Sequence, residues 1–164
     1  MGKADVIFCA ATPADVEAIT AIETRPGFWR LVGHWPAEQH LAEMRLASSH
    51  YFIADAECGA VAGFAIVQRI GGHDGRVHLQ RIAVGEPGGG LGSALLRHVV
   101  DWVFTETEAH RLDLDVHDGN DRARRCYEKA GFRAEGLLRD FHRLADGSFV
   151  SVWVMAILRP EWEA

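Results

Sequence analysis

A cluster of glycines between a strand-like and a helix-like segment is the feature that most constrains how this chain folds. Residues 88–92 read GGGLG, so four of these five positions are glycine. Residues 76–84 before it are strand-like, and Leu95, Val99 and Val103 after it follow at helical spacing. A helix N-terminus offers unpaired backbone N–H groups and about half a positive charge, and glycine lets an anion approach them closely. The junction by itself is consistent with either a phosphate-binding turn or a flexible linker without a ligand.

Counting residues excludes two familiar phosphate-binding motifs. The P-loop motif GxxxxGK[ST] fits Gly85 and Gly90, but Leu91 stands where the motif requires lysine. The dinucleotide-binding motif GxGxxG fits Gly88 and Gly90, but Ser93 stands in place of its third glycine. These mismatches argue against a nucleotide-binding α/β protein.

The periodicity of the apolar residues predicts a mixed α/β fold. The length of 164 residues favours one domain with a substantial core. Hairpin-connected strands come first and helices interleave later, so we expect parallel pairing near the two later helices. The expected strands are 6–10, 51–55, 61–70, 76–84, 112–116, 132–144 and 148–158, and the expected helices are 12–24, 37–46, the segment from the glycines to about 107, and 120–131.

A second motif lies about thirty residues after the glycines. Residues 114–132 read LDVHDGNDRARRCYEKAGF, with Asn120 at a helix start and Ala123 and Tyr127 along one face of that helix. Together with RIAV and GGGLGSALL, this segment resembles the GNAT superfamily of acyl-CoA-dependent N-acetyltransferases. The resemblance runs from about residue 60 to 158, and it is strongest to the ribosomal-protein and antibiotic amine acetyltransferases through EGLLRDFHRLADGSFVSVWVMAIL.

The resemblance implies a fold and an activity. The fold is one N-acetyltransferase domain over residues 1–164, with a mixed, largely antiparallel sheet of about seven strands flanked by about four helices. The activity is transfer of an acetyl group from acetyl-CoA to a primary amine by direct attack. The alternative is a non-catalytic acyl-CoA-binding or sensing domain of the same fold, and the presence of both Asn120 and Tyr127 favours the enzyme.

The resemblance also implies how coenzyme A is held. The strand RIAV pairs with the pantetheine arm, the backbone of residues 88–93 holds the pyrophosphate, and Asn120 steadies the pantetheine amides. Pro87 stands where the family has Gln or Arg, so we expect the backbone, assisted by Arg122, Arg124 or Arg125, to bind the phosphates more weakly than a basic loop would. The implied cofactor-binding residues are Ile82, Ala83, Val84, Gly88, Gly89, Gly90, Leu91, Gly92, Ser93, Asn120, Ala123 and Tyr127.

Acetyl transfer to an amine poses two proton problems. An amine of pKa ~10 must lose a proton before it attacks, and a departing thiolate benefits from a proton donor. The resemblance makes Tyr127 the general acid, whereas its spacing equally fits a core tyrosine. Asp115 is the candidate base, although it and Asp113 also fit a solvent-facing strand, and a relay through water, His78 or His142 is the other route.

The aromatic stretch FWRLVGHW, residues 28–35, lies where this superfamily commonly lines the acceptor pocket. Phe28, Trp29, His34 and Trp35 are therefore the candidate acceptor-binding residues, and simple packing of these rings against the sheet is the alternative. We expect no metal, because the nine histidines form neither HxxxH nor HExxH and the three cysteines are scattered.

Charge and cysteine content bound the partners. The net charge of −6 argues against nucleic acid or an anionic membrane as a partner. No window reaches the ~18 apolar residues of a membrane span. Three cysteines, an odd number, indicate reduced thiols and a cytoplasmic location. The expected partner is a small-molecule or peptide amine, and the expected assembly is a monomer or homodimer.

Overall fold

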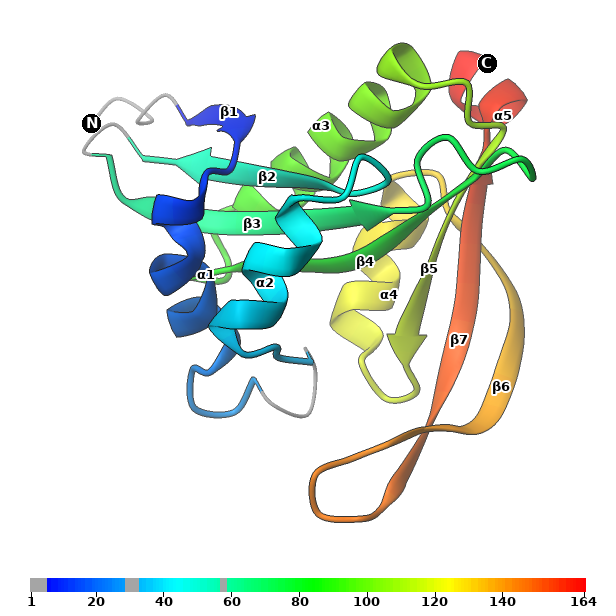
Figure 1. Cartoon of the computed structure of the whole chain (residues 1–164). Coiled ribbons are helices and arrows are strands. Elements are labelled where there is room, and N and C mark those ends of the chain that lie inside the picture. The colour runs from blue at the N-terminus through cyan, green and yellow to red at the C-terminus, as the bar shows by residue number, and fades with distance from the viewer. Residues whose placement is uncertain (1–5, 29–32, 57–58) are drawn as a thin grey trace.

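The computed structural model describes residues 6–28, 33–56 and 59–164. One seven-stranded sheet runs through it in the order β1-β2-β3-β4-β5-β7-β6 (Figure 1). This confirms the expected largely antiparallel sheet of about seven strands. The strands are β1 (Ile7–Ala10), β2 (His50–Asp55), β3 (Val61–Gln68), β4 (Arg76–Val84), β5 (Arg111–His117), β6 (Arg133–Arg143) and β7 (Phe149–Leu158).

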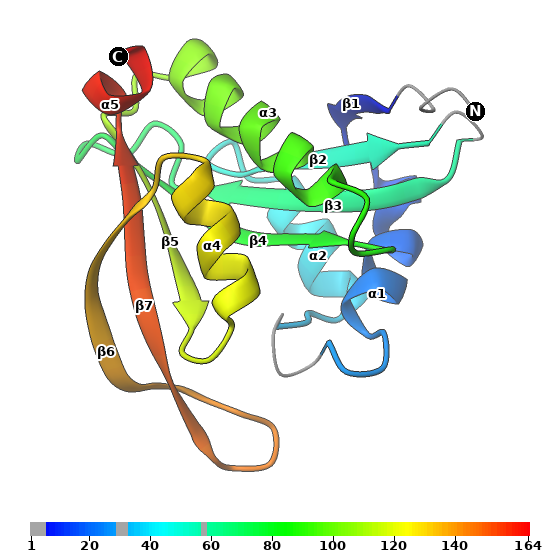
Figure 2. The same cartoon turned by 180° about the vertical axis from the view of Figure 1, so that it is seen from behind.

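Helices cover both faces of the sheet. Figures 1 and 2 show α1 and α2 on one face and α3 and α4 on the other. The described residues form five helices, against the expected number of about four, because α5 is too short for its apolar pattern to show in the sequence. The helices are α1 (Val16–Glu23), preceded by the 3-10 turn Pro13–Asp15, α2 (Ala37–Met44), α3 (Leu91–Glu106), α4 (Asp121–Lys129) and α5 (Arg159–Glu163). None of these helices is long and apolar enough to cross a membrane.

Among the described strands, parallel pairing is confined to β4 and β5, so the expectation of parallel pairing near both later helices is only half right. Helix α3 connects these two strands, and Arg76–Leu79 pairs with Arg111–Leu114. Helix α4 leads instead to β6, which pairs with β7 alone and antiparallel to it. The ends of β4 and β5 beyond this short register diverge (Figure 2).

A β-bulge in β4 changes which face each side chain occupies. Ile66 pairs with Arg81 and the next residue, Val67, pairs with Leu79, so Gln80 is the extra residue. A one-residue insertion reverses the alternation of the strand. Leu79 therefore faces the α3 side, whereas Arg81 joins the α1 and α2 side of the sheet.

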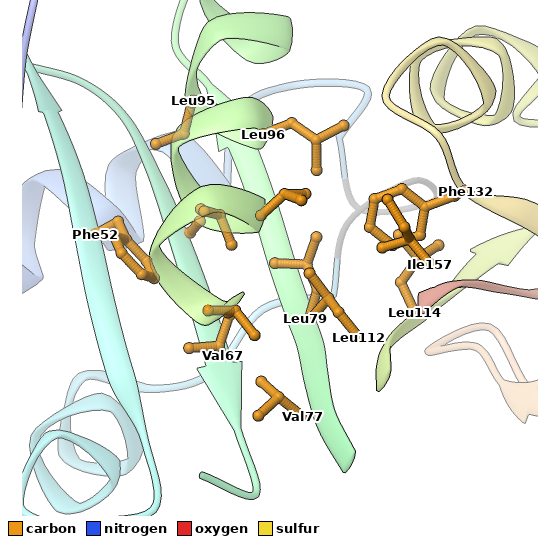
Figure 3. Close-up of a cluster of buried hydrophobic side chains, with 14 of the residues drawn as sticks. Phe52, Val67, Val77, Leu79, Leu95, Leu96, Leu112, Leu114, Phe132 and Ile157 are labelled. Carbon is orange, nitrogen blue, oxygen red and sulfur yellow. The ribbon is translucent and has the colours of Figure 1, made fainter. Parts of the chain in front are cut away.

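The larger hydrophobic core lies between the sheet and helices α3 and α4. Helix α3 buries apolar residues three and four positions apart, including Leu95 and Val99, as the sequence predicts. Figure 3 shows Phe52, Val67 and Leu79 from three neighbouring strands gathered beneath this helix. Burying each such side chain contributes about 1.5–3 kcal/mol, so this face holds the helix and its glycine-rich start in place.

Candidate active site

Two pockets meet where β4 and β5 diverge. We call the first the glycine pocket; it has a volume of about 390 Å³ and is lined by the end of β4, the start of α3, and α4. We call the second the histidine pocket; it has a volume of about 360 Å³ and is lined by residues 33–35, β4, β5 and the end of β6. Ile82, Asn120 and Tyr127 line both pockets. A molecule bound in either pocket can therefore contact the same three residues.

The glycine pocket is shaped by backbone. Gly88 and Gly90 have φ values of 103° and 81°, in the left-handed region that favours glycine. Gly90 is the N-cap of α3, and the first helical hydrogen bond runs from Ala94 N to Gly90 O at 3.1 Å. The N–H groups of residues 91–93 therefore have no acceptor within the helix. A Cβ atom added at Gly88 or Gly90 would meet nothing within 4 Å, so open space lies beside this backbone.

Most of the predicted cofactor residues line this pocket. Gly89 is the exception, because it lies between two lining glycines without lining the pocket itself. Among the three arginines that were expected to assist, Arg122 lines the pocket, whereas Arg124 stacks over Trp153 at 4.4 Å. The predicted residues that line it are Ile82, Ala83, Val84, Gly88, Gly90, Leu91, Gly92, Ser93, Asn120, Ala123 and Tyr127.

Cys126 is a lining residue that the sequence did not single out. Its Sγ lies 3.4 Å from Ser93 Oγ and so joins α4 to the start of α3. Its position one residue before Tyr127 was the available signal, because residues three and four positions after Ala123 share a helix face.

Asn120 begins helix α4 and also lines both pockets. Its Oδ1 accepts a hydrogen bond from Ala123 N at 3.3 Å, and its own N–H donates to His117 O at 2.9 Å. Because the side-chain oxygen caps the helix, the amide NH₂ is the group that this residue offers to a ligand.

Tyr127 is half-buried at the junction of the pockets. Its ring contacts Phe132, with 5.9 Å between the ring centres. Burial raises the pKa of Tyr127 above its ordinary value, and the neighbouring Cys126 thiol adds to this. The phenol therefore keeps its proton at neutral pH and can donate a hydrogen bond.

Asp115 and His142 face each other in the histidine pocket. The distance from Asp115 Oδ2 to His142 Nε2 is 3.9 Å, and the rings of His142 and His117 are 5.9 Å apart. Partial burial lowers the pKa of His142, and His117 lowers it further, against an opposing contribution from the Asp115 carboxylate. The imidazole of His142 is therefore mostly neutral at pH 7 and able to accept a proton.

Asp113 lies on the same face of β5 as Asp115 but has a different environment. It is buried and accepts hydrogen bonds from Arg76, from His78 at 2.6 Å and from Arg111 at 3.1 Å. Burial would raise the pKa of Asp113, but these hydrogen bonds outweigh it and hold the pKa well below its usual range. Asp113 is thus a fixed carboxylate that also engages His78, and neither is positioned like the Asp115–His142 pair.

A second buried charged cluster lies beneath the histidine pocket. Glu23 accepts a hydrogen bond from Arg81 Nη1 at 2.5 Å, and its other oxygen lies 2.9 Å from His40 Nε2. That oxygen also accepts from Trp35 N at 3.3 Å, which ties residues 33–35 to helix α1. Tyr51 completes the cluster through its hydroxyl, 3.0 Å from His40 Nδ1. Burial would raise the pKa of Glu23, but its hydrogen bonds to His40 and Arg81 lower it overall.

The predicted acceptor residues are divided between the two pockets. His34 and Trp35 line the histidine pocket, with the Arg81 guanidinium 4.7 Å from the Trp35 ring. Phe28 lines the glycine pocket instead and packs against the buried cluster that includes Ala83 of β4. Trp29 lies outside the described residues. Within the described ranges, no group of three His, Cys, Asp or Glu side chains could hold a metal ion.

Residues 16–132 match the acetyltransferase (GNAT) family. Over 51 residues, 31% of this chain, the sequence is 45% identical to the aminoglycoside N(6')-acetyltransferase type 1 of Klebsiella pneumoniae, 25% of which is covered. Over 76 residues, 46% of this chain, it is 37% identical to the probable N-acetyltransferase YjcK of Bacillus subtilis, 41% of which is covered. The matches therefore span less than half the length of these relatives.

Solved structures share the fold. The spermidine N-acetyltransferase from Vibrio cholerae in complex with CoA and spermine has a TM-score of 0.84, with 97% of this chain and 98% of that chain covered. A dodecameric structure of spermidine N-acetyltransferase from the same organism has a TM-score of 0.80, covering 96% of this chain and 95% of that chain. Their sequence identities to this chain are 18% and 20%, so the likeness is one of fold alone.

Proposed function

Because the chain belongs to the acetyltransferase (GNAT) family, we propose that it transfers an acetyl group from acetyl-CoA to a primary amine by direct attack. The observation that carries this proposal is the pair of pockets that share Ile82, Asn120 and Tyr127. Donor and acceptor bound on the two sides would meet at these residues, which supplies the proximity that acyl transfer requires. We further propose that residues 1–164 form one such catalytic domain.

The glycine pocket suits coenzyme A. The N–H groups of residues 91–93 have no acceptor within α3, and open space lies beside Gly88 and Gly90, which suits a pyrophosphate. The end of β4, residues 82–84, offers an apolar strand for the pantetheine arm, and the amide NH₂ of Asn120 offers a donor to it. When bound, acetyl-CoA supplies the acetyl group as an activated thioester.

The histidine pocket supplies a route for the proton of the amine. An ammonium group must lose its proton before the nitrogen can attack. Asp115 attracts the ammonium, and the neutral imidazole of His142 lies beside it to accept the proton, at 3.9 Å from the Asp115 carboxylate. Asp115 then stabilises the imidazolium by its charge, so we propose that the two residues act as a pair.

Tyr127 is the proposed donor to the leaving sulfur. Its raised pKa keeps the hydroxyl protonated, so the group stabilises a developing thiolate chiefly by hydrogen bonding. This role requires the hydroxyl to lie at the junction of the two pockets, and the proposal is supported by Tyr127 lining both of them.

The test combines two measurements on the full chain. Release of free thiol from acetyl-CoA is followed across a panel of amines, and binding of coenzyme A is measured by calorimetry. We expect thiol release that depends on the amine. Coenzyme A binding without thiol release for any amine would contradict the enzyme and indicate a binding or sensing domain. The cytoplasmic location and the monomeric or homodimeric state stay predictions.

A further inference from the structure

The ionisable groups that line the histidine pocket are mostly basic side chains. Asp115 is its one carboxylate among the described residues, whereas the basic side chains are Arg81, Arg143, His34, His78, His117 and His142. A polyamine or an aminoglycoside carries several ammonium groups, and each needs an acceptor or a carboxylate when it leaves water. A single carboxylate matches a single ammonium group.

The nearby carboxylates beneath the pocket are already engaged. Glu23 is fully buried against Arg81 and His40, and Asp113 is buried against His78 and two arginines. Neither could turn toward a cationic acceptor without leaving a buried positive charge unpaired, which is strongly unfavourable. Among the described residues that line the pocket, the negative charge available to an acceptor is therefore that of Asp115.

Of the two arginines in the described lining of the pocket, Arg81 is paired with Glu23, whereas Arg143 has capacity for a ligand. The ion pairs of the described residues give it no carboxylate partner, and its guanidinium lies over the Phe149 ring at 5.8 Å. Phe149 is its cross-strand neighbour on β7, so the ring supports the side chain without using its hydrogen-bond donors. A guanidinium presents two parallel N–H groups that match a carboxylate or a phosphate.

Arg143 also lies close to the proposed proton acceptor. It follows His142 directly on β6, and both residues line the histidine pocket. His142 in turn faces Asp115 at 3.9 Å. One small molecule could thus place its ammonium group at Asp115 and its anionic group at Arg143.

Resting on the proposed function, we infer that the acceptor is a small amine that also carries an anionic group, which Arg143 binds. The ammonium end binds at Asp115 and His142, and the anionic end lies toward the tip of the β6–β7 hairpin. Carboxylate and phosphate share the chemistry that a guanidinium recognises, and matched acceptors distinguish them. This acceptor class differs from the spermidine and aminoglycoside that the names of the relatives specify.

Matched acceptors test the inference by thiol release. Alanine is compared with alaninamide, and phosphoethanolamine with ethanolamine, with spermidine and kanamycin as polycations. We expect kcat/KM to be about 10-fold higher for the anionic member of at least one pair, from one charge-assisted contact. The amide is the less basic amine and holds more of its unprotonated form, so a preference for the acid would not come from amine basicity.

Arginine variants locate the anion site. Arg143→Gln should reduce the ratio of kcat/KM between anionic and neutral acceptors to about 1. Arg139→Gln is the matched control, because Arg139 lies on the same exposed ribbon but outside the histidine pocket. The control should keep the wild-type ratio.

Three results would overturn the inference: ratios near 1 in the wild type, higher kcat/KM for the polycations, or an unchanged ratio in Arg143→Gln. If no amine releases thiol, the proposed function fails separately. The inference is then still tested by calorimetry of the same acceptors on the protein saturated with coenzyme A. Tighter binding of the anionic member, lost in Arg143→Gln, would support it, and equal or undetectable binding would overturn it.

Discussion

The glycine pocket and the histidine pocket lie side by side but are built in different ways. The first relies on backbone N–H groups and apolar surface, contributed largely by residues 82–93 and one face of α4. The second relies on ionisable side chains from four separate segments, the most distant of which are residues 33–35 and 142–144. A binding site for a phosphate can be encoded by one short stretch of chain, whereas a site built from distant ionisable side chains must be assembled by the fold.

The two pockets also differ in what lies beneath them. Hydrophobic side chains of α3 and the sheet support the glycine pocket, including Leu95 and Leu96. The buried ion pairs of Glu23 and Asp113 support the histidine pocket. Such pairs contribute little net stability but fix geometry, because loss of one partner leaves the other as an uncompensated buried charge. We therefore expect the stability of the histidine pocket to be the more sensitive of the two to loss of a single charge.

Removal of the Glu23 charge is expected to have the largest effect. Glu23→Gln leaves the buried Arg81 without its carboxylate and should lower the free energy of unfolding by about 3–5 kcal/mol. Chemical denaturation measures this, with Glu17→Gln on the exposed face of α1 as the control. The double variant Glu23→Gln, Arg81→Met should recover part of the loss. A single variant as stable as wild type would show that the two pockets do not differ in this way.

Substitution at the junction should affect chemistry without affecting cofactor affinity. Tyr127→Phe removes only the hydroxyl, and we expect kcat to fall at least about 10²-fold because the leaving sulfur loses its donor. The Kd for coenzyme A should stay within about 2-fold of wild type, since the backbone contacts of the glycine pocket remain. Undiminished turnover would make Tyr127 a packing residue.

The pH dependence of kcat/KM should identify the proton acceptor of the histidine pocket. In the wild type, kcat/KM should rise with pH through a midpoint below 6.5, because the pKa of His142 is lowered and its protonated form cannot act as base. Asp115→Asn removes the one interaction that raises this pKa, so the midpoint should move to lower pH while the plateau falls about 10-fold. His142→Gln should abolish this limb of the profile. An unchanged limb and full rate in Asp115→Asn would remove Asp115 from the mechanism.

Adjacent glycines offer the finest test of the glycine pocket. Gly90 has a φ of 81° and lines the pocket, whereas Gly89 has neither a positive φ nor a place in the lining. Gly90→Ala should cost about 1–2 kcal/mol of stability from left-handed backbone strain and weaken coenzyme A binding. Gly89→Ala, the matched control, should change both by less than about 0.5 kcal/mol. Thermal denaturation measures the effect on stability, and calorimetry measures the effect on coenzyme A binding. Equal effects at both positions would argue against binding of the pyrophosphate by the backbone N–H groups.

Much of the fold follows from local patterns. The alternating strand 76–84 and the amphipathic helix from residue 91 are where the sequence predicts them, because side-chain periodicity determines which face is buried. Gly131 has a φ of 99° after α4, the left-handed conformation that glycine commonly adopts where a helix ends. The fifth helix and the single parallel pair of described strands were harder to predict from the sequence. The helix is only five residues long, and the pairing depends on which strand lies beside β5.

The same distinction between local sequence and tertiary structure applies to the candidate site. The sequence by itself determined the glycine turn, its helix start, and the positions of Asn120 and Tyr127 on α4, because those geometries depend on residues within one or two helical turns. Only the tertiary structure decided that Glu23 meets Arg81, 58 positions away in the chain, and that His142 faces Asp115. Isolated charged residues give no periodic signal, and their partners depend on sheet order and on the β4 bulge. Local backbone geometry is encoded by neighbours in sequence, whereas pairing of buried charges is encoded by the whole fold.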